Sequence, residues 1–239
     1  MNERKNPPTA AGSTPWTDEL SADATPAAPA ATAASEQKAA RVHLASRSPR
    51  RRELLAQVGI AFDLIAFRNP PREDPEIDET PFPGEAADAY VVRVARAKAA
   101  HGQRIVGWRK LTAQPVLAAD TTLEFAGEII GKPDDAEHAR QILHSLSGQT
   151  HRVLTAVAVA DAGRIECVLS VSEVRFARLD ADTIARYVAS GEAFDKAGAY
   201  GIQGRAGAFA AHLAGSYTGV MGLPLYETTQ LLRSFGLKV

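Results

Sequence analysis

The chain of 239 residues is poor in cysteine and lacks long apolar runs, and both absences narrow the class of protein. Cys167 is the only cysteine, which excludes an internal disulfide and a cysteine-based metal cluster and fits a reducing compartment. No run of about 18 apolar residues is present, so the sequence contains no candidate membrane-spanning helix. We therefore expect a cytoplasmic protein without a membrane partner.

An excess of charge of one sign is also absent. The sequence has 27 Lys and Arg residues against 28 Asp and Glu residues, which gives a formal net charge of −1. Proteins that gather nucleic acid through a general positive field carry a clear basic excess. We therefore expect no nucleic-acid partner, and any anion must be bound by a local group of residues.

Several familiar catalytic motifs are missing. No Gly-x-Ser-x-Gly elbow supports acyl transfer by a serine nucleophile, and neither a P-loop nor a GxGxxG fingerprint follows the first strand. The six histidines show no HExxH or other zinc-ligand spacing: His43, His101, His138, His144, His151 and His212. A phosphate site in this chain therefore needs a different construction.

Residues 1–40 differ in composition from the rest of the chain. They contain twelve alanines and five prolines, and Trp16 and Leu20 are their only large apolar anchors. Such a segment buries too little apolar surface to offset the entropy of ordering it. No apolar stretch follows the charged start, so a secretory signal is not indicated. We expect either a disordered tail or a misassigned start codon, and one folded domain over 41–239.

From Arg41 onward, short apolar runs alternate with amphipathic stretches, which is typical of an α/β domain. Pro49 suits the first helical position after Ser48 as N-cap. The predicted strands are 42–45, 115–119, 152–160, 165–178 and 208–213, and the predicted helices are 49–59, 86–100, 133–146, 181–189 and 224–235. Asp120 is expected at the end of its strand.

The first of these helices begins with Ser48-Pro49-Arg50-Arg51-Arg52. A helix N-terminus already carries about half a positive charge, so three arginines there are electrostatically misplaced unless they meet an anion. Free backbone N–H groups, the helix dipole and the arginine side chains all favour a phosphate. A charge run turned to solvent is the alternative. The strand and small-residue turn that precede the helix favour the anion site.

Asp120 follows a fully apolar strand and precedes Thr121 and Thr122. A carboxylate at a strand end in an α/β fold can hold Mg²⁺ or orient a water molecule, although a simple cap of the strand remains the alternative. Three lysines are candidate counterions for phosphate oxygens, each of which can equally be a surface residue: Lys98, Lys132 and Lys196.

The stretch 195–204 is rich in small residues and low in charge. Its glycines allow a ligand to approach the backbone closely, and the Gln203 amide can both donate and accept hydrogen bonds, as reading a pyrimidine edge requires. A structural turn is the competing interpretation.

Taken in order, several segments resemble the Maf family of nucleotide pyrophosphatases over residues 42–235. They are Leu44-Ala45-Ser46-Arg47-Ser48-Pro49-Arg50-Arg51, Ala118-Ala119-Asp120-Thr121, Gly131-Lys132-Pro133, Leu146-Ser147-Gly148-Gln149-Thr150-His151, Asp195-Lys196-Ala197-Gly198-Ala199-Tyr200-Gly201-Ile202-Gln203-Gly204 and Val220-Met221-Gly222-Leu223-Pro224. The resemblance implies an α/β fold of the inosine-triphosphate-pyrophosphatase kind, with a mixed sheet and two lobes flanking a nucleotide cleft. It also implies dependence on Mg²⁺ or Mn²⁺ and a homodimer.

The same resemblance implies the site residues. Within the family, the form of residues 195–204 looks like the branch that hydrolyses dTTP and UTP to the monophosphate and pyrophosphate. Asp120 matches the proposed general base, and Glu79, in a loop at 67–84 that is longer than usual, matches an acidic residue near the metal. Positions tied to substrate choice are matched by Arg50, Thr121 and Gln203, and polar cleft positions by Ser46, Arg51, Lys98, Lys132, Asp195 and Lys196.

Three functions share these residues. The first is housecleaning hydrolysis of dTTP and UTP, and the second is the same chemistry on modified pyrimidine triphosphates. The third is a nucleotide-binding regulator of cell division or septum formation that acts through occupancy, a process associated with the family. Release of pyrophosphate separates the enzymes from the regulator.

Overall fold

The computed structural model describes residues 40–65 and 77–239. The expected tail therefore lies outside the described residues except for Ala40, and so do residues 67–76 of the 67–84 loop. The described residues group into one compact unit. In the described part, no helix combines the length and the apolar character that crossing a bilayer requires.

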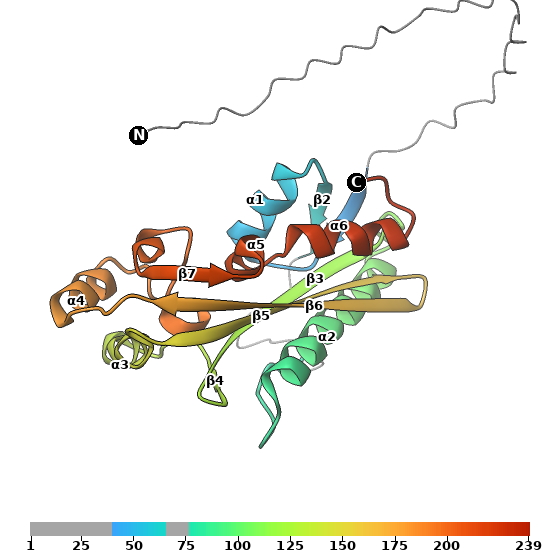
Figure 1. Ribbon diagram of the computed structural model, residues 1–239. Helices are drawn as coiled ribbons and strands as arrows, with labels where there is room; N and C mark the ends of the chain where they lie inside the picture. Colours follow the sequence, from blue (N-terminus) through green and yellow to red (C-terminus); the bar gives the residue numbers. More distant parts are fainter. Residues whose placement is uncertain (1–39, 66–76) are drawn as a thin grey trace, which may run out of the picture. The chain divides into compact units, whose positions relative to one another are not determined.

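A mixed seven-stranded sheet forms the centre of the domain (Figure 1). Its order is β2-β1-β3-β5-β6-β7, with β4 paired to β3, and only the β2-β1-β3 part is parallel. The strands are β1 (Arg41–Leu44), β2 (Ala61–Leu64), β3 (Val116–Phe125), β4 (Glu128–Ile130), β5 (Thr150–Asp161), β6 (Arg164–Phe176) and β7 (Ala210–Ala214). The α/β class with a mixed sheet, as predicted, is confirmed.

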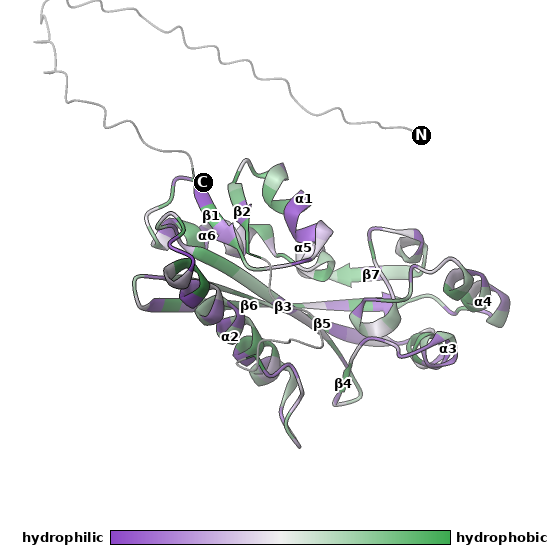
Figure 2. Ribbon diagram, turned by 180° about the vertical axis from the view of Figure 1, so that it is seen from behind, coloured by the Kyte–Doolittle hydropathy of each residue, from purple (hydrophilic) through white to green (hydrophobic). Residues whose placement is uncertain are grey.

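Helices cover both faces of this sheet. The helices are α1 (Pro49–Gln57), α2 (Ala87–Trp108), α3 (Ala136–Leu146), α4 (Ala181–Ala189), α5 (Tyr217–Met221) and α6 (Leu225–Ser234), with short 3-10 turns η1 (Ala197–Ala199) and η2 (Arg205–Ala208). In Figure 1, α2 lies on one face, α1, α5 and α6 lie on the other, and α3 and α4 lie at the far end of the long strands. Figure 2 shows hydrophobic and hydrophilic residues alternating along α2, as expected for a helix with one buried side.

The apolar start of β3 is explained by burial on both faces. Successive strand residues point to opposite sides of a sheet. Val116 and Ala118 therefore join the core cluster under α2, whereas Leu117 and Ala119 join the cluster under α1 and α6. A third cluster, between α3, α4 and the far ends of β5 and β6, forms the second lobe.

Three predictions about these elements were wrong or incomplete. β3 continues to Phe125 because β5 pairs with it antiparallel as far as Glu124, so Asp120 lies inside the strand and not at its end. The parallel neighbour β1 pairs only with Val116 and Leu117, and Asp120 lies just beyond the point where that neighbour stops. The helix predicted at 86–100 extends to Trp108, and the short strands β2 and β4 were not predicted.

Candidate active site

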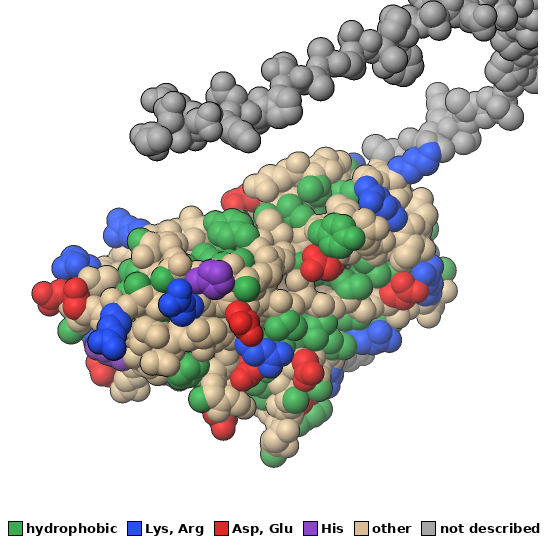
Figure 3. Space-filling view, in the orientation of Figure 1, with side chains coloured by type: hydrophobic (Ala, Val, Ile, Leu, Met, Phe, Trp, Pro, Cys, Tyr) green, Lys and Arg blue, Asp and Glu red, His purple; other side chains and the backbone are tan. Residues whose placement is uncertain are grey.

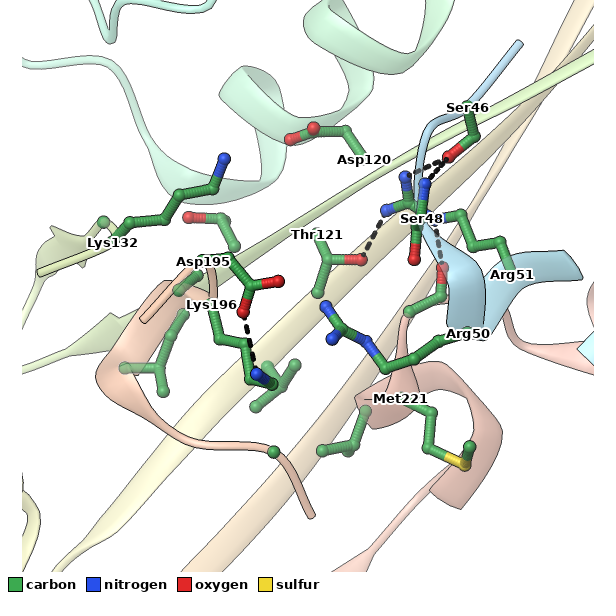
Figure 4. Close-up of a pocket in the computed structure, with 18 of the residues that line it drawn as sticks. Ser46, Ser48, Arg50, Arg51, Asp120, Thr121, Lys132, Asp195, Lys196 and Met221 are labelled. Atoms are coloured by element: carbon green, nitrogen blue, oxygen red, sulfur yellow. Dashed lines mark hydrogen bonds and ion pairs between the residues drawn. The ribbon is translucent and has the colours of Figure 1, made fainter. Parts of the chain in front are cut away.

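A pocket of about 710 Å³ opens between the start of α1, the middle of β3 and the loop around η1. Its walls include every site residue proposed from the sequence: Ser46, Arg50, Arg51, Glu79, Lys98, Lys132, Asp120, Thr121, Asp195, Lys196 and Gln203. These residues come from segments as far apart as 46 and 203, and the fold brings all of them to one cavity. Figure 4 shows how the labelled members face one another.

The loop between β1 and α1 and the first turn of α1 line this pocket. Ser48 occupies the predicted N-cap position and Pro49 begins the helix, but the Ser48 side chain makes no capping hydrogen bond. The backbone N–H of Ser48 instead donates to Ser46 Oγ over 3.2 Å. The first-turn amides of α1 are therefore uncapped by a side chain and suit an anionic ligand.

The three consecutive arginines of α1 have three different environments. Arg51 is held by the protein: its Nε donates to Gly222 O over 2.8 Å, and its guanidinium reaches Ser46 Oγ and Thr121 Oγ1 over 3.3 and 3.1 Å. Burial lowers the pKa of Arg51, and the negative charge of Asp120 opposes that shift. Arg52 does not line the pocket.

Arg50 is the arginine that is free to meet a ligand. It lines the pocket, and no partner is found for it in residues 40–65 and 77–239. Figure 4 shows its guanidinium reaching from α1 toward Thr121 and the Asp195 loop. Lys132 lines another part of the same pocket and is likewise unpaired within the described chain. Two unpaired cations facing one pocket favour a multivalent anion such as a triphosphate.

A lysine and two carboxylates form the opposite wall. Lys98 of α2 donates to Asp120 Oδ1 over 2.9 Å and lies 3.0 Å from Glu79 Oε2. Asp120 reaches Lys98 because it lies on the α2 face of β3, two residues after Ala118. Thr121 points to the other face, where it meets Arg51. The alternation of a single strand thus directs the carboxylate and the hydroxyl to different partners.

A chain of hydroxyls supports Thr121 from behind. Thr121 Oγ1 lies 3.0 Å from Thr155 Oγ1, and Thr155 donates to Gly219 O over 2.8 Å. Thr155 is fully buried on β5, directly opposite Thr121 in the register of the two strands. The hydroxyl that faces Arg51 is therefore fixed by the sheet and by α5 together.

The loop carrying residues 195–203 is held mainly by its own contacts. Lys196 Nζ donates to Glu192 O over 2.8 Å, to Phe194 O over 3.4 Å and to Asp195 Oδ1 over 2.7 Å. These bonds use the three protons of the ammonium group within the loop. The geometry therefore makes Lys196 a support for this wall, whereas the exposed Gln203 keeps its amide available.

Two aromatic residues anchor the same loop to the second lobe. Tyr187 OH accepts from Gly201 N over 3.2 Å, and Tyr200 OH lies 2.8 Å from His151 Nε2. Burial lowers the pKa of His151 to about 4, so this histidine is neutral near pH 7. His151 belongs to the Leu146–His151 motif, and its place behind Tyr200 gives that motif a structural role.

The residues that can hold a divalent cation are Glu79 and Asp120. No group of three or more His, Cys, Asp or Glu side chains with metal-ligand geometry occurs in the described part of the chain. Mg²⁺ binds oxygen ligands and often uses one or two carboxylates, with substrate phosphates and water completing its shell. Two carboxylates brought together by one ammonium group fit that pattern.

A family model described as "Maf-like protein" matches residues 41–235 of this sequence. The chain belongs to the Maf family. It is 64% identical over 198 residues to a protein named dTTP/UTP pyrophosphatase from Dechloromonas aromatica, covering 83% of this chain and 98% of that one. It is 61% identical over 198 residues to a protein of the same name from Aromatoleum aromaticum, covering 82% and 96%.

A solved structure with lower similarity is also found. "The structure of the Staphylococcus aureus Ham1 protein" aligns over 82% of this Maf chain and 97% of its own length, with a TM-score of 0.41 and 14% identity.

Some residues of this Maf site had no role assigned from the sequence. Tyr90 lines the pocket, and its hydroxyl donates to Glu79 O over 3.0 Å. Gly222 has φ 116° and presents its carbonyl to Arg51. Gly222 lies in the quoted Val220–Pro224 motif, so its place in the motif was a usable signal, whereas nothing in the local sequence around Tyr90 indicated its contact.

Proposed function

We propose that this Maf protein hydrolyses dTTP and UTP to the nucleoside monophosphate and pyrophosphate, as part of nucleotide-pool housecleaning. The observation that carries the proposal is that unpaired cations and carboxylates line one pocket. Unpaired Arg50 and Lys132 offer cations for phosphate oxygens, and Asp120 and Glu79 offer carboxylates to the same pocket. The high identity to two proteins named dTTP/UTP pyrophosphatase supports this substrate class.

Asp120 is the group proposed to activate water. Lys98 occupies its Oδ1, and its Oδ2 has no protein partner within the described segments, so Oδ2 is available to accept a proton from water. The oxygen of that water attacks the α-phosphorus, and the bond from the α-phosphorus to the bridging oxygen breaks. The departing pyrophosphate takes that oxygen with the electron pair.

Cations at the phosphate end stabilise the leaving group. Arg50 and Lys132 neutralise charge that develops on pyrophosphate, which is the main contribution a protein makes to phosphoryl chemistry. Three of the five N–H groups of Arg51 are used within the protein, so two remain for phosphate oxygens. Lys98 donates one of its three protons to Asp120 and forms an ion pair with Glu79.

We propose Mg²⁺ or Mn²⁺ as the cofactor, and Glu79 and Asp120 are the residues that would hold it. A divalent cation supplies charge neutralisation for the triphosphate when it is bound. The support in this chain is the pair of carboxylates, Glu79 and Asp120, that both lie within hydrogen-bonding distance of Lys98 Nζ on the pocket wall.

A panel of canonical and modified nucleoside triphosphates, assayed for pyrophosphate with Mg²⁺ and with Mn²⁺, tests the proposal. We expect release from dTTP and UTP to be much faster than release from ATP and GTP, and Gln203→Leu to reduce that preference. Binding of UTP without pyrophosphate release would refute the enzymatic function. Equal rates on purine triphosphates would refute the role of Gln203.

We also propose a homodimer in the cytoplasm, where nucleoside triphosphates are made and used. The support for a dimer is a patch of exposed apolar side chains formed by Leu169 and Val171 of β6 with Tyr226 of α6. Figure 3 shows several hydrophobic side chains over β6 and α6, with acidic side chains between them. Sedimentation equilibrium of the protein and of Val171→Glu tests it. A monomeric wild type would refute the dimer.

A further inference from the structure

The segment that carries Glu79 has neither helix nor strand to hold it. Residues 77–85 are mostly exposed loop, and the Glu79 side chain itself is 53% exposed. Its carboxylate nevertheless lies 3.0 Å from Lys98 Nζ, inside the pocket wall. This loop segment must therefore be held in place by contacts with α2.

Three consecutive carbonyl groups of this segment accept hydrogen bonds from α2. Arg93 Nη1 donates to Asp78 O over 2.8 Å, and Arg93 Nη2 donates to Thr80 O over 3.0 Å. The carbonyl between them, Glu79 O, accepts from Tyr90 OH over 3.0 Å. The backbone on both sides of Glu79 is therefore fixed by one guanidinium group.

Arg93 is itself fixed by the end of the same segment. It forms a two-pronged pair with Glu85, from Nε to Oε1 and from Nη2 to Oε2, both over 2.7 Å. The guanidinium carbon lies 4.0 Å from the centroid of the Phe82 ring. Hydrogen bonding from Arg93 also lowers the pKa of Glu85 to about 2, so the pair stays charged over the whole working range of pH.

We infer that Arg93 is a positioning residue that fixes Glu79 beside Lys98 and so sets the affinity of the site for Mg²⁺ or Mn²⁺. The inference rests on the metal dependence proposed above. Arg93 does not line the pocket, so it acts through the backbone of residues 78–80 and touches neither substrate nor metal. Outer residues that orient a metal ligand typically affect metal affinity by about 10- to 100-fold.

Arg93→Gln and Glu85→Gln test this inference, because each breaks the pair without adding bulk. Arg164→Gln is the control: Arg164 also donates through Nε and Nη2 to a carboxylate, here to the single oxygen Oε1 of Glu166, and stacks on an aromatic ring, and it does not line the pocket. Binding of Mn²⁺ would be measured by paramagnetic resonance of the free ion, with α,β-methylene-UTP present. Thermal melting of each variant shows whether it is folded.

We expect Arg93→Gln and Glu85→Gln to weaken Mn²⁺ binding by about 10- to 100-fold, and Arg164→Gln to leave it unchanged. At saturating Mn²⁺ the two variants should recover kcat to within about twofold of wild type, because excess metal selects the ordered segment. Combining Arg93→Gln with Glu79→Gln should add no further loss of affinity, since the arginine acts through Glu79.

Unchanged Mn²⁺ affinity in folded Arg93→Gln, or additive losses in the double variant, would overturn the inference. A reduced kcat with normal Mn²⁺ affinity would overturn it as well. If Arg93→Gln does not fold, Glu85→Gln answers the same question. The two proposals fail in different ways. A wild-type protein that releases no pyrophosphate would refute the proposed function. An active wild-type protein with an Arg93 variant that binds Mn²⁺ normally would refute only the role of Arg93.

Discussion

Replacing Arg51 by lysine tests whether the middle arginine of α1 is a structural support as well as a phosphate ligand. Its guanidinium joins three segments that are distant in sequence, through Ser46, Thr121 and Gly222. A lysine ammonium keeps the charge but has one nitrogen, and the three acceptors lie around different nitrogens of the arginine. Lysine therefore replaces at most one of the three bonds.

The expected loss follows from the two bonds that cannot be replaced. A hydrogen bond to a charged group contributes about 1.5 to 3 kcal/mol, and the lower figure is appropriate because the bonds to the two hydroxyls are 3.1 and 3.3 Å long. Two such bonds give about 3 kcal/mol of unfolding free energy. For a domain of this size that loss lowers Tm by about 6 to 12 °C. Displacement of Thr121 should lower kcat/KM for UTP by about 100-fold.

Arg50→Lys and Arg52→Lys are the controls for this prediction. Arg52 does not line the pocket, so its substitution should change neither Tm nor kcat/KM. Arg50 lines the pocket without a protein partner, so its substitution should lower kcat/KM and leave Tm within about 1 °C, since surface changes are usually small. Thermal melts and pyrophosphate release measure both quantities. Equal Tm values for Arg51→Lys and Arg52→Lys would refute the supporting role of Arg51.

Three further predictions concern other parts of the site. Asp120→Asn should keep the fold and lower kcat by about 10²- to 10⁴-fold in the pyrophosphate assay, and near-normal turnover would exclude it as the base. His151 has a pKa of about 4 in the folded protein against 6.5 in the unfolded chain, so the free energy of unfolding should fall as pH drops from about 6.5 to 4. Urea titrations should show a fall about 3 kcal/mol larger than in His151→Asn. The same pH dependence of unfolding free energy in both proteins would contradict this. Gly198→Ala should lower the free energy of unfolding by about 2 kcal/mol more than Gly163→Ala does. Both glycines have positive φ, but only at position 198 would an added Cβ overlap the Leu123 side chain. Equal losses of unfolding free energy would contradict the overlap.

Much of the fold was readable from the sequence because its signals are local. The apolar run at 115–119 predicted a strand there, and Ser48-Pro49 predicted the start of α1 correctly. β2 was missed because its four residues are only partly buried or exposed, and they form a strand through parallel pairing with β1. Pairing between distant segments leaves little trace in a short stretch of sequence.

The extent of β3 shows the same limit. The sequence placed the end of the strand at Asp120, because the apolar run stops there. The antiparallel partner β5 continues the strand to Phe125, so backbone pairing with a distant segment overrides the local change in polarity. The carboxylate still faces the pocket, since its neighbour β1 ends earlier and leaves that side of the strand uncovered.

The sequence by itself determined which residue types are available for phosphate chemistry: arginines at a helix start, a carboxylate after an apolar run and an amide in a glycine-rich loop. Only the tertiary structure decided what each of them does. The four cations Arg50, Arg51, Lys132 and Lys196 carry the same positive charge. Protein acceptors bind Arg51 and Lys196, whereas Arg50 and Lys132 face the pocket without a partner in the described residues. That division depends on contacts between segments far apart in the chain, such as Arg51 with Gly222, which no local pattern encodes.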